Sequence, residues 1–494
     1  MDRPQPDQGV GAAVRRFAEA AFTLDVRGLA AFRISLGVIL IVDCLLRSRD
    51  FSTMFGPDGI FPPDEMRRFH GDPLRWSLAL AFDSPWWAAL VLAAEGIAGA
   101  CMAAGWYSRA ATIAAWVAVV SVTRRTAPAT NAGDVWLCCL LFWSMFLPLA
   151  EVWAMDARRR RDRRATACSV ATAAFVLQSA FVYFGAGLAK CNESWLSGEA
   201  MSHALSVHDH GNRLGSLIGR LRWLTRPLTW CVVAAELAGP VLLVAAPVAR
   251  VRAMVVAAFI VFHVVIWMTM SVGLFAWIGI TAWLPLVPSR WWDAVSSRPE
   301  GGVAGLGRVP TVVCTAALAV ATISFLHYWG VFGTARLPRP IAAGVAIGCL
   351  DQEWSMFGSV PPQEQWVYGR AELADGRVVD LLRGGRPLER ERPDGGFISL
   401  AHHRWHKLFW MLPRPHIRVF APATAARLAR EWNDTHPPEQ RVVSLEIRFA
   451  AQSVSRPDAA LQEMLVAAWP PRGQEGEGNL DRLLESVDVR SAGR

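Results

Sequence analysis

The sequence predicts a mainly α-helical, polytopic membrane protein with about nine transmembrane helices, followed by a small extracytoplasmic α+β domain. Two observations predict this fold class. Hydrophobic side chains make up 53% of the 494 residues, and they form long apolar runs of a length suited to crossing a bilayer. After about residue 340 these runs stop, and the chain shows the alternation and turn residues of a small mixed domain.

Nine apolar segments are the predicted membrane crossings. A helix needs about 20 apolar residues to cross the hydrocarbon core, so the shorter segments have the least certain ends. The predicted crossings are 30–47, 85–104, 109–123, 134–153, 168–189, 228–248, 253–270, 272–288 and 309–332. The chain is therefore divided into a cytoplasmic N-terminus (1–29), a transmembrane domain (30–335), an extracytoplasmic α+β domain (336–470) and a disordered tail (471–494).

Basic residues between the crossings predict the orientation. Residues 155–164, MDARRRRDRR, hold six arginines in one short connection, which places this connection in the cytoplasm. When the predicted crossings are counted in both directions from this connection, the N-terminus lies inside. The loop after Lys190 and the chain beyond residue 333 then lie outside. Arg124 and Arg125 fall on the outer side in this scheme, against the usual bias.

The region after residue 340 has its own pattern. WVYGRAELADGRVVDLL predicts two strands joined by a turn at Asp375-Gly376, because Asp-Gly is a strong hairpin signal. Residues 423–433 predict an amphipathic helix, and RVVSLEIRFAAQSV predicts a further strand. The last residues are rich in charge and glycine, which is typical of a disordered tail.

Several functional classes have no support. The net charge of +8 lies largely in short clusters that membrane topology explains, so we predict no nucleic-acid partner. The nine cysteines form no CxxC pair and are interpreted as small buried hydrophobic residues. The HDH motif at 208–210 lacks a nearby third ligand, so we predict no metal site. Nucleotide-binding and hydrolase motifs are absent from the sequence.

Charged residues inside apolar segments are costly in lipid and need a partner or a watery cavity. We interpret Arg33 as an interfacial side chain that extends to the headgroups. Asp43 and Glu95 are expected to make hydrogen bonds between helices, and His263 alone would be a hydrogen-bonded core histidine. The full set is Arg33, Asp43, Glu95, Asp134, Lys190, Glu236 and His263.

Lys190 ends an apolar segment within FVYFGAGLAKCNESWLSGEAM, residues 181–201. A lysine at a helix end commonly extends to the membrane interface. However, the fifty basic residues of the chain include only one other lysine, Lys407. Arginine cannot give up its charge, whereas a buried lysine can become a neutral amine and act as a base. Both interpretations of Lys190 remain open from the residues alone.

The same stretch resembles a known family. YFGAGLAKCNESWLSGEAM is similar to the vitamin K-dependent γ-glutamyl carboxylases and their bacterial relatives, the horizontally transferred transmembrane (HTTM) domain proteins. Six further segments match the family's patterns in the correct order. They are LAAFRISLGVILIVD (29–43), FHVVIWMTMSVGLFAWIGITAWLP (262–285), DQEWSMF (351–357), ADGRVVDLL (374–382), HRWHK (403–407) and REWN (430–433).

The resemblance implies a chemistry for Lys190. In the carboxylases the lysine at this position deprotonates vitamin K hydroquinone, which then reacts with oxygen and removes a γ-proton from a peptide glutamate. The carbanion takes up carbon dioxide, and the quinone leaves as its epoxide. The implied co-substrates are reduced vitamin K or menaquinol with O₂ and CO₂, and the implied partners are the lipid bilayer and a secreted peptide. The implied location is a bacterial inner or plasma membrane.

The resemblance also implies supporting residues around quinone and substrate. These are Asn131, Trp195, Gly198, His263 and Trp354. One position departs from the family, because Ala132 follows Asn131 where the carboxylases carry a histidine thought to stabilise the carbanion. Epoxidation could survive this loss, whereas carboxylation is put in doubt. The alternative function is a non-redox partner in maturation or export of a secreted peptide or toxin. A transporter is less favoured, because broken paired helices are not evident.

Overall fold

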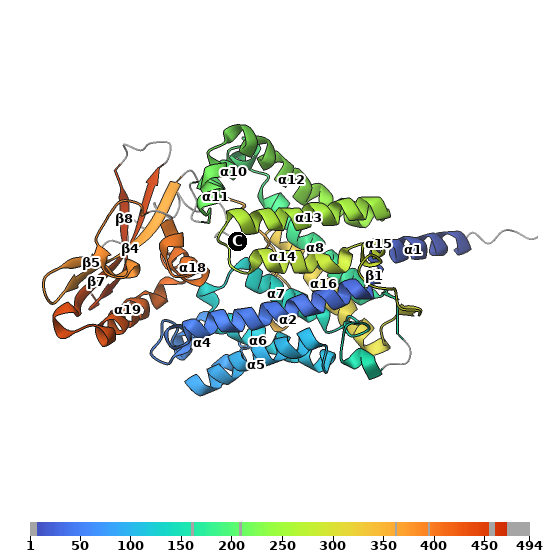
Figure 1. Ribbon diagram of the computed structural model, residues 1–494, viewed down its shortest axis with the longest axis horizontal. Coiled ribbons are helices and arrows are strands. Elements are labelled where there is room, and N and C mark those ends of the chain that lie inside the picture. The colour runs from blue at the N-terminus through green and yellow to red at the C-terminus, as the bar shows by residue number, and fades with distance from the viewer. Residues whose placement is uncertain are drawn as a thin grey trace, which may run out of the picture.

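The computed structural model describes residues 7–159, 163–206, 210–360, 363–393, 396–453 and 460–471. A helical bundle forms the larger part, and the C-terminal α+β domain lies at one end of it (Figure 1). The tail predicted at 471–494 lies outside the described residues apart from its first position. The same is true of most of the HDH motif, of which only His210 is described.

Six helices of the described residues are long and apolar enough to cross a membrane. Each falls in a predicted segment, so the multi-pass helical class is confirmed. These helices are α2 (Val26–Arg49), α5 (Pro85–Ala104), α8 (Val170–Ala189), α12 (Arg222–Ala245), α13 (Ala249–Thr269) and α16 (Arg308–Tyr328). The other three predicted segments contain α6 (Ser108–Arg125), α7 (Ala132–Ser144) and α14 (Phe275–Trp283). The count of nine crossings is therefore not confirmed.

The segment predicted at 134–153 was wrong in its extent. Helix α7 ends at Ser144, and the chain turns before Pro148. Proline lacks a backbone N–H and disfavours helical geometry in the residue before it, so the helix cannot continue through this point. Shorter helices complete this part of the chain. They are α1 (Asp7–Phe22), α3 (Phe51–Phe55), α4 (Pro63–His70), α9 (Glu193–Leu196), α10 (Ala200–Ser206), α11 (Arg213–Gly219), α15 (Ser289–Trp292) and α17 (Arg339–Gly348).

A small sheet ties three chain segments together at the end of the bundle away from the C-terminal domain. Strand β1 (Leu24–Asp25) pairs antiparallel with β2 (Thr166–Ala167), which pairs parallel with β3 (Val303–Ala304). Helix α1 and strand β1 lie at one side of Figure 1 and the C-terminal domain at the other. The N-terminal region and the chain just after the arginine-rich connection thus share one end of the molecule. Which end faces the cytoplasm stays a prediction.

Arg124 and Arg125 are buried and satisfy backbone groups. Arg124 donates to the carbonyl oxygen of Trp76 at 2.8 Å, and Arg125 donates to those of Phe61 at 2.6 Å and Phe55 at 3.0 Å. The positive-inside bias concerns basic residues in the loops that flank the membrane. These two arginines are structural, so they do not count against the predicted orientation.

The interpretation of Arg33 as an interfacial side chain was wrong. Its side chain is fully buried, and it donates to the carbonyl oxygens of Leu149 at 3.0 Å, Ala103 at 2.9 Å and Trp153 at 2.6 Å. These carbonyls lie at the ends of helices or in turns, where the backbone has no helical partner. The guanidinium group has several donors in one plane and therefore joins three chain segments.

The C-terminal domain is built on a five-stranded antiparallel sheet with the order β6-β5-β4-β7-β8. Its strands are β4 (Gln363–Leu373), β5 (Val378–Asp380), β6 (Arg386–Pro387), β7 (Val442–Ser453) and β8 (Gln462–Trp469), and its helices are α18 (His403–Met411) and α19 (Ala421–Thr435). The predicted hairpin, helix and strand are confirmed. Gly376 adopts φ +84° in the β4–β5 turn, a conformation that glycine tolerates best.

The domain packs directly on the bundle. Side chains from the segment after α2 and from the C-terminal domain share one apolar core, and the rings of Phe61 and Phe420 meet edge to face with centroids 5.4 Å apart. Helix α18 lies at the bundle side of the sheet, next to the ends of α2 and α7 (Figure 1). The two parts therefore meet at a buried junction.

Candidate active site

Lys190 is buried and paired at the C-terminal end of α8. Its Nζ atom lies 2.8 Å from Oε2 of Glu236 on α12, with both side chains at most 5% exposed. The amine also donates to the carbonyl oxygens of Met356 at 2.8 Å and Ala186 at 3.2 Å. The side chain therefore does not extend to the membrane interface. From the sequence, Glu236 is only one of several charges in apolar segments, whereas the fold makes it the partner of Lys190.

A glycine on α8 allows this pairing. A methyl group at Gly187 would lie 3.0 Å from the Leu237 side chain and 3.1 Å from the backbone of Glu236. Such distances are tighter than ordinary contacts, so the absent side chain lets α12 approach α8 closely. Close approach of the helix backbones brings the carboxylate of Glu236 within reach of Lys190.

The residues around Lys190 hold one stretch of backbone. Lys190 binds the carbonyl of Met356, the indole of Trp195 donates to that of Phe357 at 2.8 Å, and Asn192 donates to that of Gly358 at 2.6 Å. Three consecutive carbonyls are thus bound by side chains of one short motif. The amine also lies 5.2 Å from the centre of the Trp195 ring, a distance suited to a cation–π contact.

Trp354 and Gly198 belong to the two chain segments that meet at this centre. Trp354 is buried, and its indole donates to Oε1 of Gln352 at 2.7 Å, while Gln352 donates to Gln178 of α8 at 3.1 Å. Gly198 has φ +85°, and a methyl group there would lie 2.6 Å from the Arg226 side chain. Gly198 therefore shapes the turn after α9, and Trp354 anchors the chain that reaches Lys190.

His263 forms a separate centre. Its imidazole is fully buried, with Nε2 2.6 Å from the hydroxyl of Tyr183, which also accepts a hydrogen bond from Trp283 at 2.7 Å. Tyr183 precedes Lys190 by two turns of α8, roughly 10 Å along the helix axis. A methyl group at Gly279 would overlap the His263 ring. The structure thus places His263 away from the amine of Lys190.

Asn131 lies at a third place, where it caps α7. Its Oδ1 atom accepts from the backbone N–H groups of Gly133 at 2.7 Å and Asp134 at 3.2 Å, and Asp134 accepts from the backbone N–H of Asn131 at 2.9 Å. This reciprocal arrangement is a capping box, which satisfies otherwise unpaired donors at the helix start. Ala132 is the first residue of α7.

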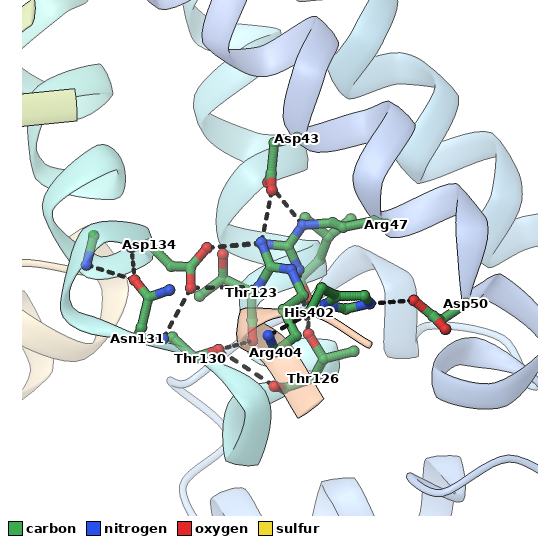
Figure 2. A network of polar contacts seen from close by, with 12 residues as sticks. Asp43, Arg47, Asp50, Thr123, Thr126, Thr130, Asn131, Asp134, His402 and Arg404 are labelled. Atoms are coloured by element: carbon green, nitrogen blue, oxygen red, sulfur yellow. Dashed lines mark hydrogen bonds and ion pairs between the residues drawn. The ribbon is translucent and has the colours of Figure 1, made fainter. Parts of the chain in front are cut away.

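A buried ion network joins the bundle to the C-terminal domain at this place, and we call it the junction network (Figure 2). Arg404 of α18 lies 2.6 Å from Asp43 of α2 and 3.0 Å from Asp134 of α7. Arg47 lies 2.7 Å from Asp43 and 3.1 Å from Asp134. All four side chains are at most 8% exposed. The expected contact of Asp43 is confirmed, although its partners are arginines.

Next to the junction network, Asp50 and His402 form a further close pair. A small pocket adjoins the network and is lined in part by Asn131, Phe275 and His403. Burial lowers the pKa of His403 from 6.5 to about 4, and the neighbouring charge of Arg404 acts in the same direction. His403 is therefore neutral near pH 7. In the sequence, the signals for this place are Asn131, the HRWHK segment and the acidic residues in the apolar segments.

The fold and these centres define a class of protein: a polytopic helical membrane protein with a buried lysine–glutamate pair and a C-terminal α+β domain fastened to the bundle by ion pairs. The family model described as HTTM domain matches residues 23–292. The chain therefore belongs to the HTTM domain family, as the resemblance in the sequence predicted. The matched range includes Lys190, Glu236 and His263. Searches of curated proteins and of solved structures gave no significant match.

Proposed function

We propose that this HTTM protein is a membrane-embedded, quinol-dependent enzyme that resembles the vitamin K-dependent γ-glutamyl carboxylases. It would couple hydroquinone epoxidation to modification of an exported peptide, with γ-carboxylation of glutamate as the model reaction. The observation that supports this proposal best is the buried pair of Lys190 and Glu236. The apolar helices around it suit a lipid-soluble co-substrate.

The pair can supply a neutral amine. A lysine acts as a base only after it has lost its proton, and Glu236 lies 2.8 Å from Nζ. A buried ion pair has a large desolvation penalty. Transfer of the proton from Lys190 to Glu236 removes both charges and leaves two neutral groups in an apolar site. The amine of Lys190 can then accept a proton from a quinol hydroxyl. A reduced quinone, when bound with oxygen, supplies the strong base that the side chains themselves lack.

The surrounding residues fit an aromatic quinol. Trp195 and Trp354 are both buried, and the ring of Trp195 lies 5.2 Å from the amine of Lys190. Aromatic pairs gain from offset or edge-to-face packing. The backbone at Met356 to Gly358 is held by three side chains, so this wall of the site is rigid. We therefore assign base function to Lys190 and proton acceptance to Glu236.

The alanine at position 132 should affect epoxidation and uptake of carbon dioxide differently. By resemblance, the carboxylases use a histidine at this position on the carbanion, and a methyl side chain has no donor or acceptor to replace it. We expect epoxidation to depend on Lys190 and Glu236, whereas uptake of carbon dioxide needs a group that Ala132 does not supply. Measuring the two reactions separately tests this division.

The test is direct. Purified protein is incubated with reduced naphthoquinone and oxygen, and quinone epoxide is measured by chromatography. We expect epoxide from the wild-type protein and none from Lys190→Ala or Lys190→Arg, with thermal melting used to show that the variants are folded. Arg109→Lys, on an exposed helix position, is the control substitution. Absence of epoxide from the wild-type protein, where an authentic carboxylase is active, would exclude the enzyme function.

A non-redox role in maturation or export of a secreted peptide is the second candidate, and one observation favours it. A charged Lys190 can be held by hydrogen bonds to the carbonyls of Met356 and Ala186 and by the ion pair with Glu236. In this arrangement Lys190 fixes the fold near residue 356. This role predicts that Lys190→Ala reduces stability or peptide export, while the wild-type protein forms no epoxide.

A further inference from the structure

Helix α11 turns its small residues inward and its large apolar residues outward. Gly215 and Gly219, one turn apart, are buried, whereas the side chains of Leu214 and Leu217 are 41% and 60% exposed. Leu221, just after the helix, is 38% exposed. A helix that faces water on its outer side has the opposite pattern, with its apolar residues turned inward. The outer face of α11 therefore suits contact with lipid.

The start of α11 is fastened to the end of a long apolar helix. The side-chain amide of Asn212 donates to the carbonyl oxygen of Met268 at 2.9 Å, and its backbone N–H donates to that of Thr269 at 3.0 Å. A methyl group at Gly215 would overlap the Thr269 carbonyl, so the absent side chain allows this close contact. Because α13 is long and apolar enough to cross a membrane, α11 lies at a membrane boundary.

The same stretch carries positive charge. Residues 212–230 contain four arginines and no acidic residue. All four arginines are exposed, and they are Arg213, Arg220, Arg222 and Arg226. Arg222 lies 3.5 Å from Glu199, while the other three form no ion pair with any residue that the structure describes. Their charge is therefore available to an anion from outside the protein.

Two exposed tryptophans accompany the arginines. Trp223 is 75% exposed and Trp230 is 45% exposed. The indole of Trp230 donates to the carbonyl oxygen of Leu196 at 3.0 Å, and the guanidinium of Arg226 lies 5.6 Å from the centre of its ring. Tryptophan is enriched where the headgroups of a membrane meet its apolar core. Exposed leucine, tryptophan and arginine together are typical of a segment that lies in the headgroup region.

We propose that residues 212–230, which include α11 and the first turns of α12, form a binding surface for anionic phospholipid headgroups. The leucines and tryptophans would contact the upper acyl chains, and the arginines would contact the phosphates. The positive charge favours an anionic lipid over a zwitterionic one, and the exposed apolar side chains favour a lipid over an acidic peptide in water. This inference goes beyond the proposed function, and it does not depend on any reaction at Lys190.

Photochemical cross-linking can locate the lipid on the intact protein. The full chain in a neutral detergent is illuminated with phosphatidylglycerol that carries a photoreactive group next to its headgroup, and the labelled peptides are identified by mass spectrometry. We expect label within residues 212–230, displaced by unlabelled phosphatidylglycerol and much less by phosphatidylcholine of the same chain length. Absence of label there, or equal displacement by the two lipids, would overturn the proposal.

Matched triple variants test the role of charge. Changing Arg213, Arg220 and Arg226 together to glutamine should reduce labelling of 212–230 by about tenfold or more, because each basic residue adds to the attraction of an anionic lipid. Changing them to lysine should retain most of the label. The control changes three exposed arginines of the C-terminal domain to glutamine and should label like the wild type. These three are Arg386, Arg390 and Arg441.

Two outcomes of the variant series would overturn the proposal. One is equal labelling of the glutamine triple and the control, and the other is a lysine triple that labels as weakly as the glutamine triple. Melting curves show whether each variant is folded. A glutamate-rich peptide that binds the wild type in phosphatidylcholine nanodiscs, but not the glutamine triple, would assign the surface to a peptide instead. Because cross-linking needs no quinol, its result is independent of the epoxide assay.

Discussion

The Nζ atom of Lys190 and Oε2 of Glu236 lie 2.8 Å apart, with both side chains almost completely buried. The two residues come from different membrane helices, α8 and α12, so the pair exists only in the packed bundle. Breaking a buried ion pair by removing one partner leaves an uncompensated charge, which is more costly than replacing both partners. This asymmetry gives the first prediction.

Glu236→Gln should destabilise the protein by about 3–5 kcal/mol, because the charge of Lys190 then lacks its buried counter-ion. Lys190→Met combined with Glu236→Met should recover much of this loss, since no buried charge remains. Denaturation of the purified protein in detergent measures both effects. A loss in the double variant that is as large as the loss in Glu236→Gln, or larger, would contradict the pairing. Glu236→Gln should also suppress epoxide formation if Glu236 accepts the proton of Lys190.

Arg404→Leu should detach the C-terminal domain from the bundle. Asp43 and Asp134 would then share Arg47 as their one ion-pair partner among the described residues, so one buried negative charge is left uncompensated, at a cost of about 3–5 kcal/mol. Arg404→Lys should restore only part of the stability, because one ammonium cannot contact both carboxylates as the planar guanidinium does. Limited proteolysis and amide exchange across α18 report the loosening. Arg441→Leu, at an exposed position, is the control and should exchange like the wild type.

The stability of the junction should fall in mild acid. His403 has an ordinary pKa of 6.5 and a folded pKa of about 4. As the pH falls from 6.5 towards 4, the unfolded chain binds a proton there and the folded chain does not, so the free energy of unfolding decreases. His406, whose pKa burial lowers to about 3, contributes in the same direction. Denaturation at several pH values should show a shallower slope for His403→Gln, and an unchanged slope would refute this account.

Reporter fusions test the orientation. A reporter joined after Arg164 should be cytoplasmic, and one joined after Trp354 should be external, because strand β2, directly after the arginine-rich connection, pairs with β1 at the end of the bundle opposite the C-terminal domain. A cytoplasmic signal from the second fusion would place Lys190 on the wrong side for exported peptides. Substituting Arg124 and Arg125 should not invert the topology, since both are buried against backbone carbonyls.

The sequence predicts much of the fold because long apolar runs and an Asp-Gly turn are local signals. Six predicted segments coincide with helices able to cross a membrane, and the strands and helix of the C-terminal domain are confirmed. The errors have a common cause. The extent of α7 depends on a turn before Pro148, and the place of Arg33 depends on carbonyls from two distant segments, the end of α5 and the turns after α7.

The candidate site shows the same division. Lys190 and Trp195 are close in the sequence and meet around one stretch of backbone, whereas Asn131 and His263 lie at two other places. The sequence does not indicate that Glu236 pairs with Lys190. The number of residues between two helices does not determine which of their side chains come into contact.

The sequence by itself determined that this protein is a helical membrane protein of the HTTM family with an unusual lysine at a helix end. Hydrophobicity and short motifs carry that information locally. Only the tertiary structure decided that Lys190 is paired with Glu236 and that Arg404 closes the junction with Asp43 and Asp134. These are consequences of burial, since a charge removed from water must find partners that only packing can bring near.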